Sequence, residues 1–127
     1  MPDFKYGDLT EKIIGAAFRV HNTLGNGFQE VIYQRALEIE FRNMGLDYAR
    51  EFEMPIFYLS EQIGTRRVDF LVQDCISIEL KAIIKIEDVH LSQAMNYLEA
   101  YNLEIGLLIN FGSKRMVPPL LKQKIQS

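Results

Sequence analysis

The segment that most constrains the fold runs from Arg66 to Ala82 and reads RRVDFLVQDCISIELKA. It holds two runs of strand-forming residues separated by a few polar ones, so the two strands are expected to pair as an antiparallel hairpin. The length of the loop sets the register of the pairing. The register in turn decides which side chains share a face of the sheet.

Hydrophobic patterning selects a three-residue loop, Gln73-Asp74-Cys75. In that register one face of the hairpin is wholly apolar and consists of Val68, Phe70, Val72, Ile76, Ile78 and Leu80. The opposite face consists of Arg67, Asp69, Leu71, Ser77, Glu79 and Lys81. A two-residue loop would mix charged and core residues on both faces, and three-residue hairpin loops are common. We therefore predict that Asp69 lies opposite Glu79.

This register brings two carboxylates together on a half-buried surface. Directly opposite residues of an antiparallel pair have α-carbons about 4.5–5.5 Å apart. Two carboxylates that close repel each other and need a cation or a shared proton. Hard oxygen ligands favour Mg²⁺ or Mn²⁺, and Lys81 follows Glu79 on the same face. Asp69, Glu79 and Lys81 are therefore the candidate catalytic set.

The remaining residues predict an α/β domain with a mixed sheet. Helices are expected at about 8–24, 29–44 and 88–101, and strands at about 48–59, 66–72, 76–84 and 105–109. Gly45 is expected to end the second helix, and residues 60–65 are expected to form a turn. The tail after Asn110 is left unassigned, with Pro118-Pro119 limiting any helix to the last residues. Without a repeat or a linker, the 127 residues are expected to form one domain.

Composition limits the kinds of partner. The formal net charge is −3, which excludes binding of a polyanion through bulk charge. Contact with nucleic acid must then use a local basic patch or a metal ion. No apolar run approaches the roughly 18 residues of a membrane span, so no membrane partner is expected. The start of the chain has no signal-peptide pattern, and the single cysteine, Cys75, fits a cytoplasmic protein.

A carboxylate on one strand followed by Glu-x-Lys on the next resembles the PD-(D/E)XK nuclease superfamily. The matching residues are Asp69 and Glu79-Leu80-Lys81, with Val68 where the motif name has proline. Residues Gly27 to Tyr33 read G-x-x-E-x-x-Y, which is similar to the signature of the small GxxExxY family of that superfamily. Gln93-x-x-x-Tyr97 is similar to a helix motif of its exonuclease-like branches.

The resemblance implies a restriction-endonuclease-like fold, with a mixed central sheet flanked by helices. It also implies a metal site for Mg²⁺ or Mn²⁺, formed by Asp69, Glu79, the backbone carbonyl of Leu80 and Glu30. Lys81 would orient the attacking water molecule, and Glu30 would join the acidic residues of the catalytic set. Gln93 and Tyr97 would help to position nucleic acid.

Each of these assignments has a plainer alternative. The charged strand residues would otherwise form a solvent-facing salt bridge, which is their usual role in sheets. Glu30 would otherwise complement the dipole of the helix that it begins. Gln93 and Tyr97 would otherwise form a hydrogen-bonded pair at a helix flank. The strongly apolar flanks of both hairpin strands favour the site over the salt bridge.

The expected function is metal-dependent hydrolysis of phosphodiester bonds in nucleic acid, with DNA expected ahead of RNA. A homodimer is also expected, because a domain this small covers few base pairs alone. The alternative is a non-catalytic module that keeps the nuclease fold and binds nucleic acid or protein. The low positive charge favours that alternative, and the intact set of two acids and a lysine argues against it. A nucleotide phosphohydrolase ranks last, since the chain has no glycine-rich phosphate loop.

Overall fold

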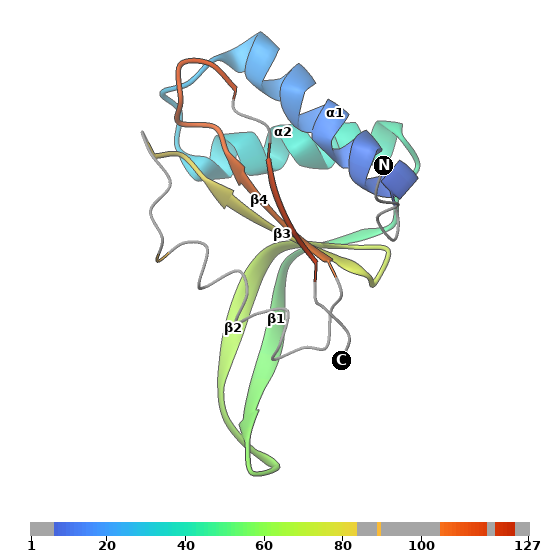
Figure 1. The fold of residues 1–127 in the computed structure, drawn as a ribbon, viewed down its shortest axis with the longest axis vertical. Helices are drawn as coiled ribbons and strands as arrows, with labels where there is room; N and C mark the ends of the chain where they lie inside the picture. Colours follow the sequence, from blue (N-terminus) through green and yellow to red (C-terminus); the bar gives the residue numbers. More distant parts are fainter. Residues whose placement is uncertain (1–6, 84–88, 90–104, 117–118, 124–127) are drawn as a thin grey trace.

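The computed structural model describes residues 7–83, 89, 105–116 and 119–123 (Figure 1). The described elements are α1 (Gly7–Leu24), α2 (Glu30–Asn43), β1 (Tyr48–Tyr58), β2 (Glu61–Val72), β3 (Ile76–Lys81), β4 (Ile105–Asn110) and β5 (Leu120–Gln123). The strands form one sheet in the order β1-β2-β3-β4-β5, in which only β3 and β4 run parallel. The predicted α/β class with a mixed sheet is confirmed. The helix predicted at 88–101, which carries Gln93 and Tyr97, lies outside the described residues except for Val89.

The two helices lie together beside the sheet and supply one wall of the core (Figure 1). Their fully buried side chains are Ile13, Ala16 and Ala17 from α1, and Tyr33, Leu37 and Phe41 from α2. Gly45, with a φ of 69°, ends α2 as predicted. Its N–H donates to the carbonyl of Arg42, and the N–H of Leu46 donates to that of Phe41, which is the Schellman arrangement of a helix end.

The β2–β3 hairpin has the predicted register. Phe70 pairs with Ile78, and Val72 pairs with Ile76 across the three-residue loop 73–75. Two loop residues, Gln73 and Asp74, have φ values of 49° and 56°. The predicted apolar face is buried throughout, with relative exposures of at most 1% for Val68, Phe70, Val72, Ile76, Ile78 and Leu80.

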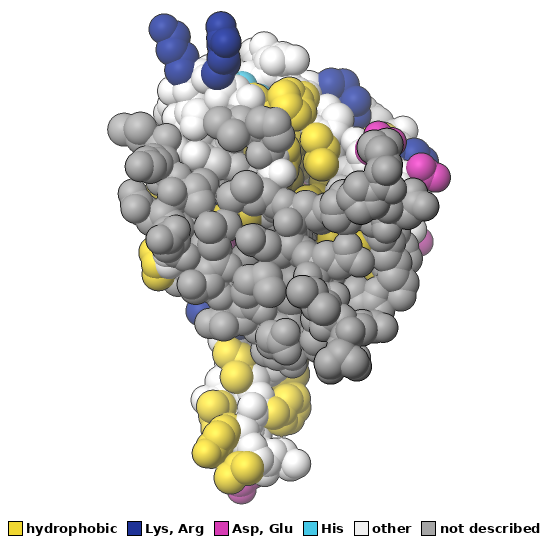
Figure 2. Space-filling view, viewed as in Figure 1, with side chains coloured by type: hydrophobic (Ala, Val, Ile, Leu, Met, Phe, Trp, Pro, Cys, Tyr) yellow, Lys and Arg dark blue, Asp and Glu magenta, His cyan; other side chains and the backbone are white. Residues whose placement is uncertain are grey.

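The β1–β2 hairpin is longer than predicted. Tyr58 pairs with Glu61 across a two-residue turn, Leu59-Ser60, whose φ values of 48° and 68° are both left-handed. Such a turn matches the twist of the strands that it joins, so pairing continues through the residues predicted as a turn at 60–65. Residues 55–64, here called the arm, project from the body (Figure 1). Hydrophobic side chains gather along it (Figure 2), and the exposed large ones are Phe57, Tyr58, Leu59 and Ile63.

Strand β4 lies between β3 and β5 in the sheet. All of its residues are buried, as predicted for a continuous apolar run covered on both faces. It lies parallel to β3, and Lys81 is paired with Asn110. The unassigned tail contributes β5, which pairs antiparallel with β4 after Pro118-Pro119. Proline is tolerated before an edge strand because it has no N–H to donate to the ladder.

Candidate active site

Asp69 lies where the pairing of β2 is interrupted on both sides. On one side the pairs run from Arg50 with Phe70 to Phe52 with Val68, and they omit Glu51 and Asp69. Glu51 itself has a φ of 52°, in the left-handed region that residues other than glycine rarely adopt. Irregular backbone of this kind is concentrated at functional sites.

On the β3 side, the paired residues end at Phe70 and Ile78, so Asp69 and Glu79 come next in the register without being a ladder pair. The Asp69 carboxylate makes hydrogen bonds at this interruption of the ladder. Its Oδ2 accepts a hydrogen bond from the backbone N–H of Leu80 at 2.7 Å. Its Oδ1 accepts one from Gln34 Nε2 at 3.0 Å. Asp69 therefore joins β2 to both β3 and α2.

Glu79 is the most perturbed acid of the site. Burial, followed by the negative charge of Asp69, raises the pKa of its carboxyl to about 8, against the opposing effects of Lys81 and Arg66. Burial is likewise the main cause that raises the pKa of Asp69, although the bonds from Leu80 and Gln34 and the charge of Lys81 lower it. Each half-buried acid therefore favours a proton or a cation beside it.

Glu30, the first residue of α2, belongs to the same electrostatic group. Partial burial raises the pKa of Glu30, which Lys81 lowers and Asp69 raises. Glu30 also contributes to the raised pKa of Glu79. The structure thus brings Glu30, Asp69 and Glu79 within electrostatic range of one another and of Lys81.

The backbone around Lys81 is held by the end of β4. The N–H of Phe111 donates to the carbonyl of Lys81 at 2.8 Å. The Asn110 amide then bonds the backbone of Ile83 in both directions, with Oδ1 accepting from its N–H at 3.0 Å and Nδ2 donating to its carbonyl at 2.8 Å. Gly112 approaches Ile83 so closely that a Cβ would overlap its backbone. These contacts fix the chain that leaves the site.

Two buried side-chain oxygen atoms of this region have no hydrogen-bond partner among the described residues: Oε1 of Glu79 and Oε1 of Gln34. Buried polar atoms are normally paired, and an exception usually marks a functional group or an absent water molecule or ion. Oxygen atoms of this kind suit a hard divalent cation. Among the described residues, however, no three His, Cys, Asp or Glu side chains lie close enough together to enclose a metal ion. A cation here would need further oxygen ligands, such as water or substrate phosphate.

Gln34 is the residue of this region that the sequence did not indicate. It is buried one helical turn after Glu30, and residues four apart lie on the same face of a helix. The four-residue spacing between Glu30 and Gln34 is the sequence feature that could have indicated Gln34. The N–H of Leu80 donates to Asp69, while the predicted role of its carbonyl oxygen as a metal ligand stays a prediction. Gln93 and Tyr97 lie outside the described residues.

Tyr33 supports the loop between the helices. Its hydroxyl donates to the carbonyl of Gly25 at 2.6 Å and accepts from the N–H of Phe28 at 3.2 Å. Its ring stacks on Phe111, with centroids 4.6 Å apart. Gly27, with a φ of 107°, makes the turn that leads into α2. The G-x-x-E-x-x-Y residues therefore fix the beginning of α2 and place Glu30 at the site.

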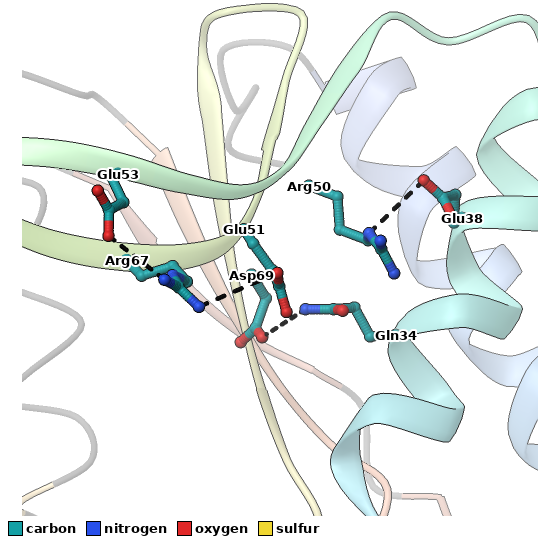
Figure 3. A network of polar contacts seen from close by, with 7 residues as sticks. All are labelled: Gln34, Glu38, Arg50, Glu51, Glu53, Arg67 and Asp69. Carbon is teal, nitrogen blue, oxygen red and sulfur yellow. Dashed lines mark hydrogen bonds and ion pairs between the residues drawn. The ribbon is translucent and has the colours of Figure 1, made fainter.

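Arg67 lies on the predicted polar face of the hairpin, but its contacts are with other acids. Its guanidinium lies 3.3 Å from Glu53 and 4.0 Å from Glu51. Figure 3 shows this group next to the bond between Gln34 and Asp69, with the Glu51 carboxylate between the two. The negative charge of Glu51 contributes to the raised pKa of Asp69.

Comparison with known proteins supports a family assignment. The family model described as "PD-(D/E)XK nuclease superfamily" matches residues 7–122. A solved structure described as "Crystal structure of SSO0001" is similar in fold, with a TM-score of 0.52 and 14% sequence identity over 93% of this chain and 67% of that one. No curated protein matches the chain. Among the described residues, no helix has both the length and the apolar character that crossing a membrane requires.

Proposed function

Because the chain belongs to the PD-(D/E)XK nuclease superfamily, we propose that it hydrolyses phosphodiester bonds in nucleic acid at Asp69, Glu79 and Lys81, with Glu30 as a further acid. One observation carries the proposal. Three carboxyl groups with raised pKa values act on one another across a site that also contains a lysine. Strongly perturbed, mutually coupled groups of this kind are characteristic of catalytic sites.

The residues present suit a divalent cation. Asp69, Glu79, Glu30 and the carbonyl oxygen of Leu80 are the groups that would hold Mg²⁺ or Mn²⁺. A bound cation of this kind would lower the pKa of a water molecule and polarise the scissile phosphate. Lys81 would orient that water molecule and offset negative charge in the transition state. The hydrogen bonds to Asp69 would keep its carboxylate in a fixed orientation throughout.

The G-x-x-E-x-x-Y residues support a narrower assignment to the GxxExxY family. In that assignment Gly27 and Tyr33 build the turn that presents Glu30. We also expect DNA to be preferred over RNA and the protein to form a homodimer, which size-exclusion chromatography would test.

The decisive experiment is cleavage of labelled DNA and RNA of the same sequence, single- and double-stranded, with Mg²⁺ or Mn²⁺ and with EDTA. Wild type is expected to cut only with metal. Lys81→Ala is expected not to cut, whereas Lys12→Ala, which removes an exposed lysine of α1, is expected to cut as wild type does. Cleavage by Lys81→Ala at the wild-type rate would refute the proposal, because the activity would then come from elsewhere or from a contaminant.

A non-catalytic binding module is the second candidate. It is favoured by the absence, among the described residues, of three side chains close enough to enclose a metal ion. The same experiment separates the two functions, because a binding module would retain labelled nucleic acid in a gel-shift assay and release no product with either metal.

A further inference from the structure

Gln34 is a buried polar residue that is bound to the central acid of the site. Its relative exposure is 4%, and its Nε2 donates to Asp69 Oδ1 at 3.0 Å (Figure 3). The other oxygen of Asp69 accepts from the backbone of Leu80 at 2.7 Å. Both oxygens are therefore held by donors on different elements, one on α2 and one on β3.

The Gln34 amide donates to Asp69, whereas its own oxygen accepts no hydrogen bond from the described residues. The NH₂ group must face the carboxylate, because an amide oxygen in its place would be repelled by it. That orientation leaves Oε1 buried without a hydrogen-bond partner in the part of the chain that the structure describes. A buried acceptor without a partner is unfavourable, and a glutamine that served only to fill space would carry this cost without any gain. The cost points to a role beyond packing.

The position of Gln34 in α2 also relates two acids. Glu30 precedes it by one helical turn and begins the helix. The bond from Gln34 to Asp69 therefore ties the first turns of α2 to β2 at the point where the ladder of β2 is interrupted. Loss of this bond would remove the side-chain contact by which α2 holds the Asp69 carboxylate.

We propose that Gln34 is a positioning residue that fixes the Asp69 carboxylate against α2. The inference rests on the proposed function, since it assigns how one acid of that site is oriented. Gln34 acts through Asp69, so its removal should weaken cation binding and turnover more than binding of nucleic acid. Residues that orient metal ligands typically change metal affinity by 10–100-fold when they are removed.

The test compares Gln34→Met, which keeps the length of the side chain without a donor, with Gln34→Glu, which places a carboxylate against Asp69. Gln62→Met is the matched control, because Gln62 is an exposed glutamine in the arm. Calorimetry would measure Mg²⁺ binding to each intact protein. Steady-state cleavage would give kcat and KM for labelled DNA. Circular dichroism and thermal melting would confirm folding.

For Gln34→Met we expect the Kd for Mg²⁺ to rise about 10-fold or more, kcat to fall by a similar factor and KM to change less than about 3-fold. Gln34→Glu is expected to lower kcat without weakening Mg²⁺ binding as much, because the added charge attracts the cation. Gln62→Met is expected to match wild type. If Gln34→Met does not fold, the split between kcat and Kd in Gln34→Glu still decides the question.

A double-mutant cycle with Asp69→Asn, measured by urea unfolding without metal, tests the contact itself. Gln34→Met should raise the unfolding equilibrium constant at least about 10-fold more with Asp69 present than in Asp69→Asn, because hydrogen bonds to charged groups are among the stronger ones. Equal effects in both backgrounds would overturn the inference. The inference would also be overturned if the wild type is active and both Gln34 variants keep its Mg²⁺ affinity and its kcat. A wild type that neither binds Mg²⁺ nor cuts would instead refute the proposed function, and with it this role.

Discussion

Two clusters of charged side chains are centred on strand β2, one at Arg67 and the other at Asp69. The two clusters differ in burial and in the pKa values of their acids. The surface cluster consists of Arg67 with Glu51 and Glu53, whose side chains are 46–59% exposed. The buried cluster consists of Asp69 with Glu79, Glu30 and Lys81. Burial raises the pKa of each of its acids, whereas each acid of the surface cluster lies within 4.0 Å of Arg67.

Both clusters combine acidic side chains with one basic side chain. The difference comes from what covers them. Gln34 of α2 and the backbone of Leu80 bond to Asp69, and the end of β4 fixes the chain beyond Lys81. The contrast indicates that desolvation is what raises the pKa values of the buried acids, so it can be tested by comparing changes in the two clusters.

The largest contrast is expected in catalysis. Asp69→Asn should reduce cleavage by about 10²–10³-fold or more, which is typical when a group that stabilises the transition state is removed. Arg67→Ala should leave the rate within about 2-fold, because its partners lie on the surface. Steady-state cleavage of the same labelled DNA measures both variants. A large loss of activity in Arg67→Ala would indicate that both clusters belong to one site.

The next contrast concerns packing in the body, at Gly112, and in the arm, at Gly64. Gly112→Ala would force a Cβ into the backbone of Ile83, and overpacking of this kind costs about 1–3 kcal/mol of the free energy of unfolding. Gly64→Ala in the arm meets nothing within 4 Å and should change that free energy by less than about 0.5 kcal/mol. Urea unfolding compares them. Equal losses would mean that the arm is as tightly packed as the body.

The third contrast is the dependence of stability on pH. The pKa of Glu79 is about 8 in the folded protein and near 4.5 when exposed, so the folded state binds the proton more tightly. Stability from this group is fully present below pH 4.5 and is lost as the pH rises toward 8, at about 1.4 kcal/mol per pH unit at most. Glu79→Gln should reduce the decline in metal-free protein to the part that Asp69 and Glu30 contribute, and should raise stability at pH 8. Glu53→Gln should leave the decline unchanged when unfolding is followed across that pH range.

The smallest effect is expected from the ion pairs of the surface cluster. Exposed pairs contribute about 0.2–1 kcal/mol each, and salt screens them. Because Arg67 makes two such pairs, Arg67→Ala should lower the free energy of unfolding by at most about 2 kcal/mol, with less effect at 1 M salt than at 0.05 M. Urea titrations at both salt concentrations measure this. A loss that is independent of salt would indicate that the arginine stem stabilises the hairpin through packing.

The sequence predicted the hairpin register because alternation of apolar residues is a strong local signal, and Val68 to Leu80 left one consistent pairing. The turn predicted at 60–65 was wrong, because Leu59-Ser60 forms a left-handed turn without the asparagine or glycine that normally marks one. The sequence missed β5, where Pro118-Pro119 obscured an edge strand. Gln34 was not indicated because the orientation of Asp69 depends on the packing of α2 against the sheet, which local patterning does not encode.

The parallel pairing of β3 with β4 also has a consequence for biosynthesis. A ribosome makes the chain from its N-terminus, so Glu30, Asp69, Glu79 and Lys81 emerge before Asn110 and the glycine that closes on Ile83. A nascent chain that stops short of residue 105 carries all four of these charged groups but lacks the strand that fixes the last of them. If the proposed function holds, activity would therefore require β4 to be synthesised and added to the sheet beside β3.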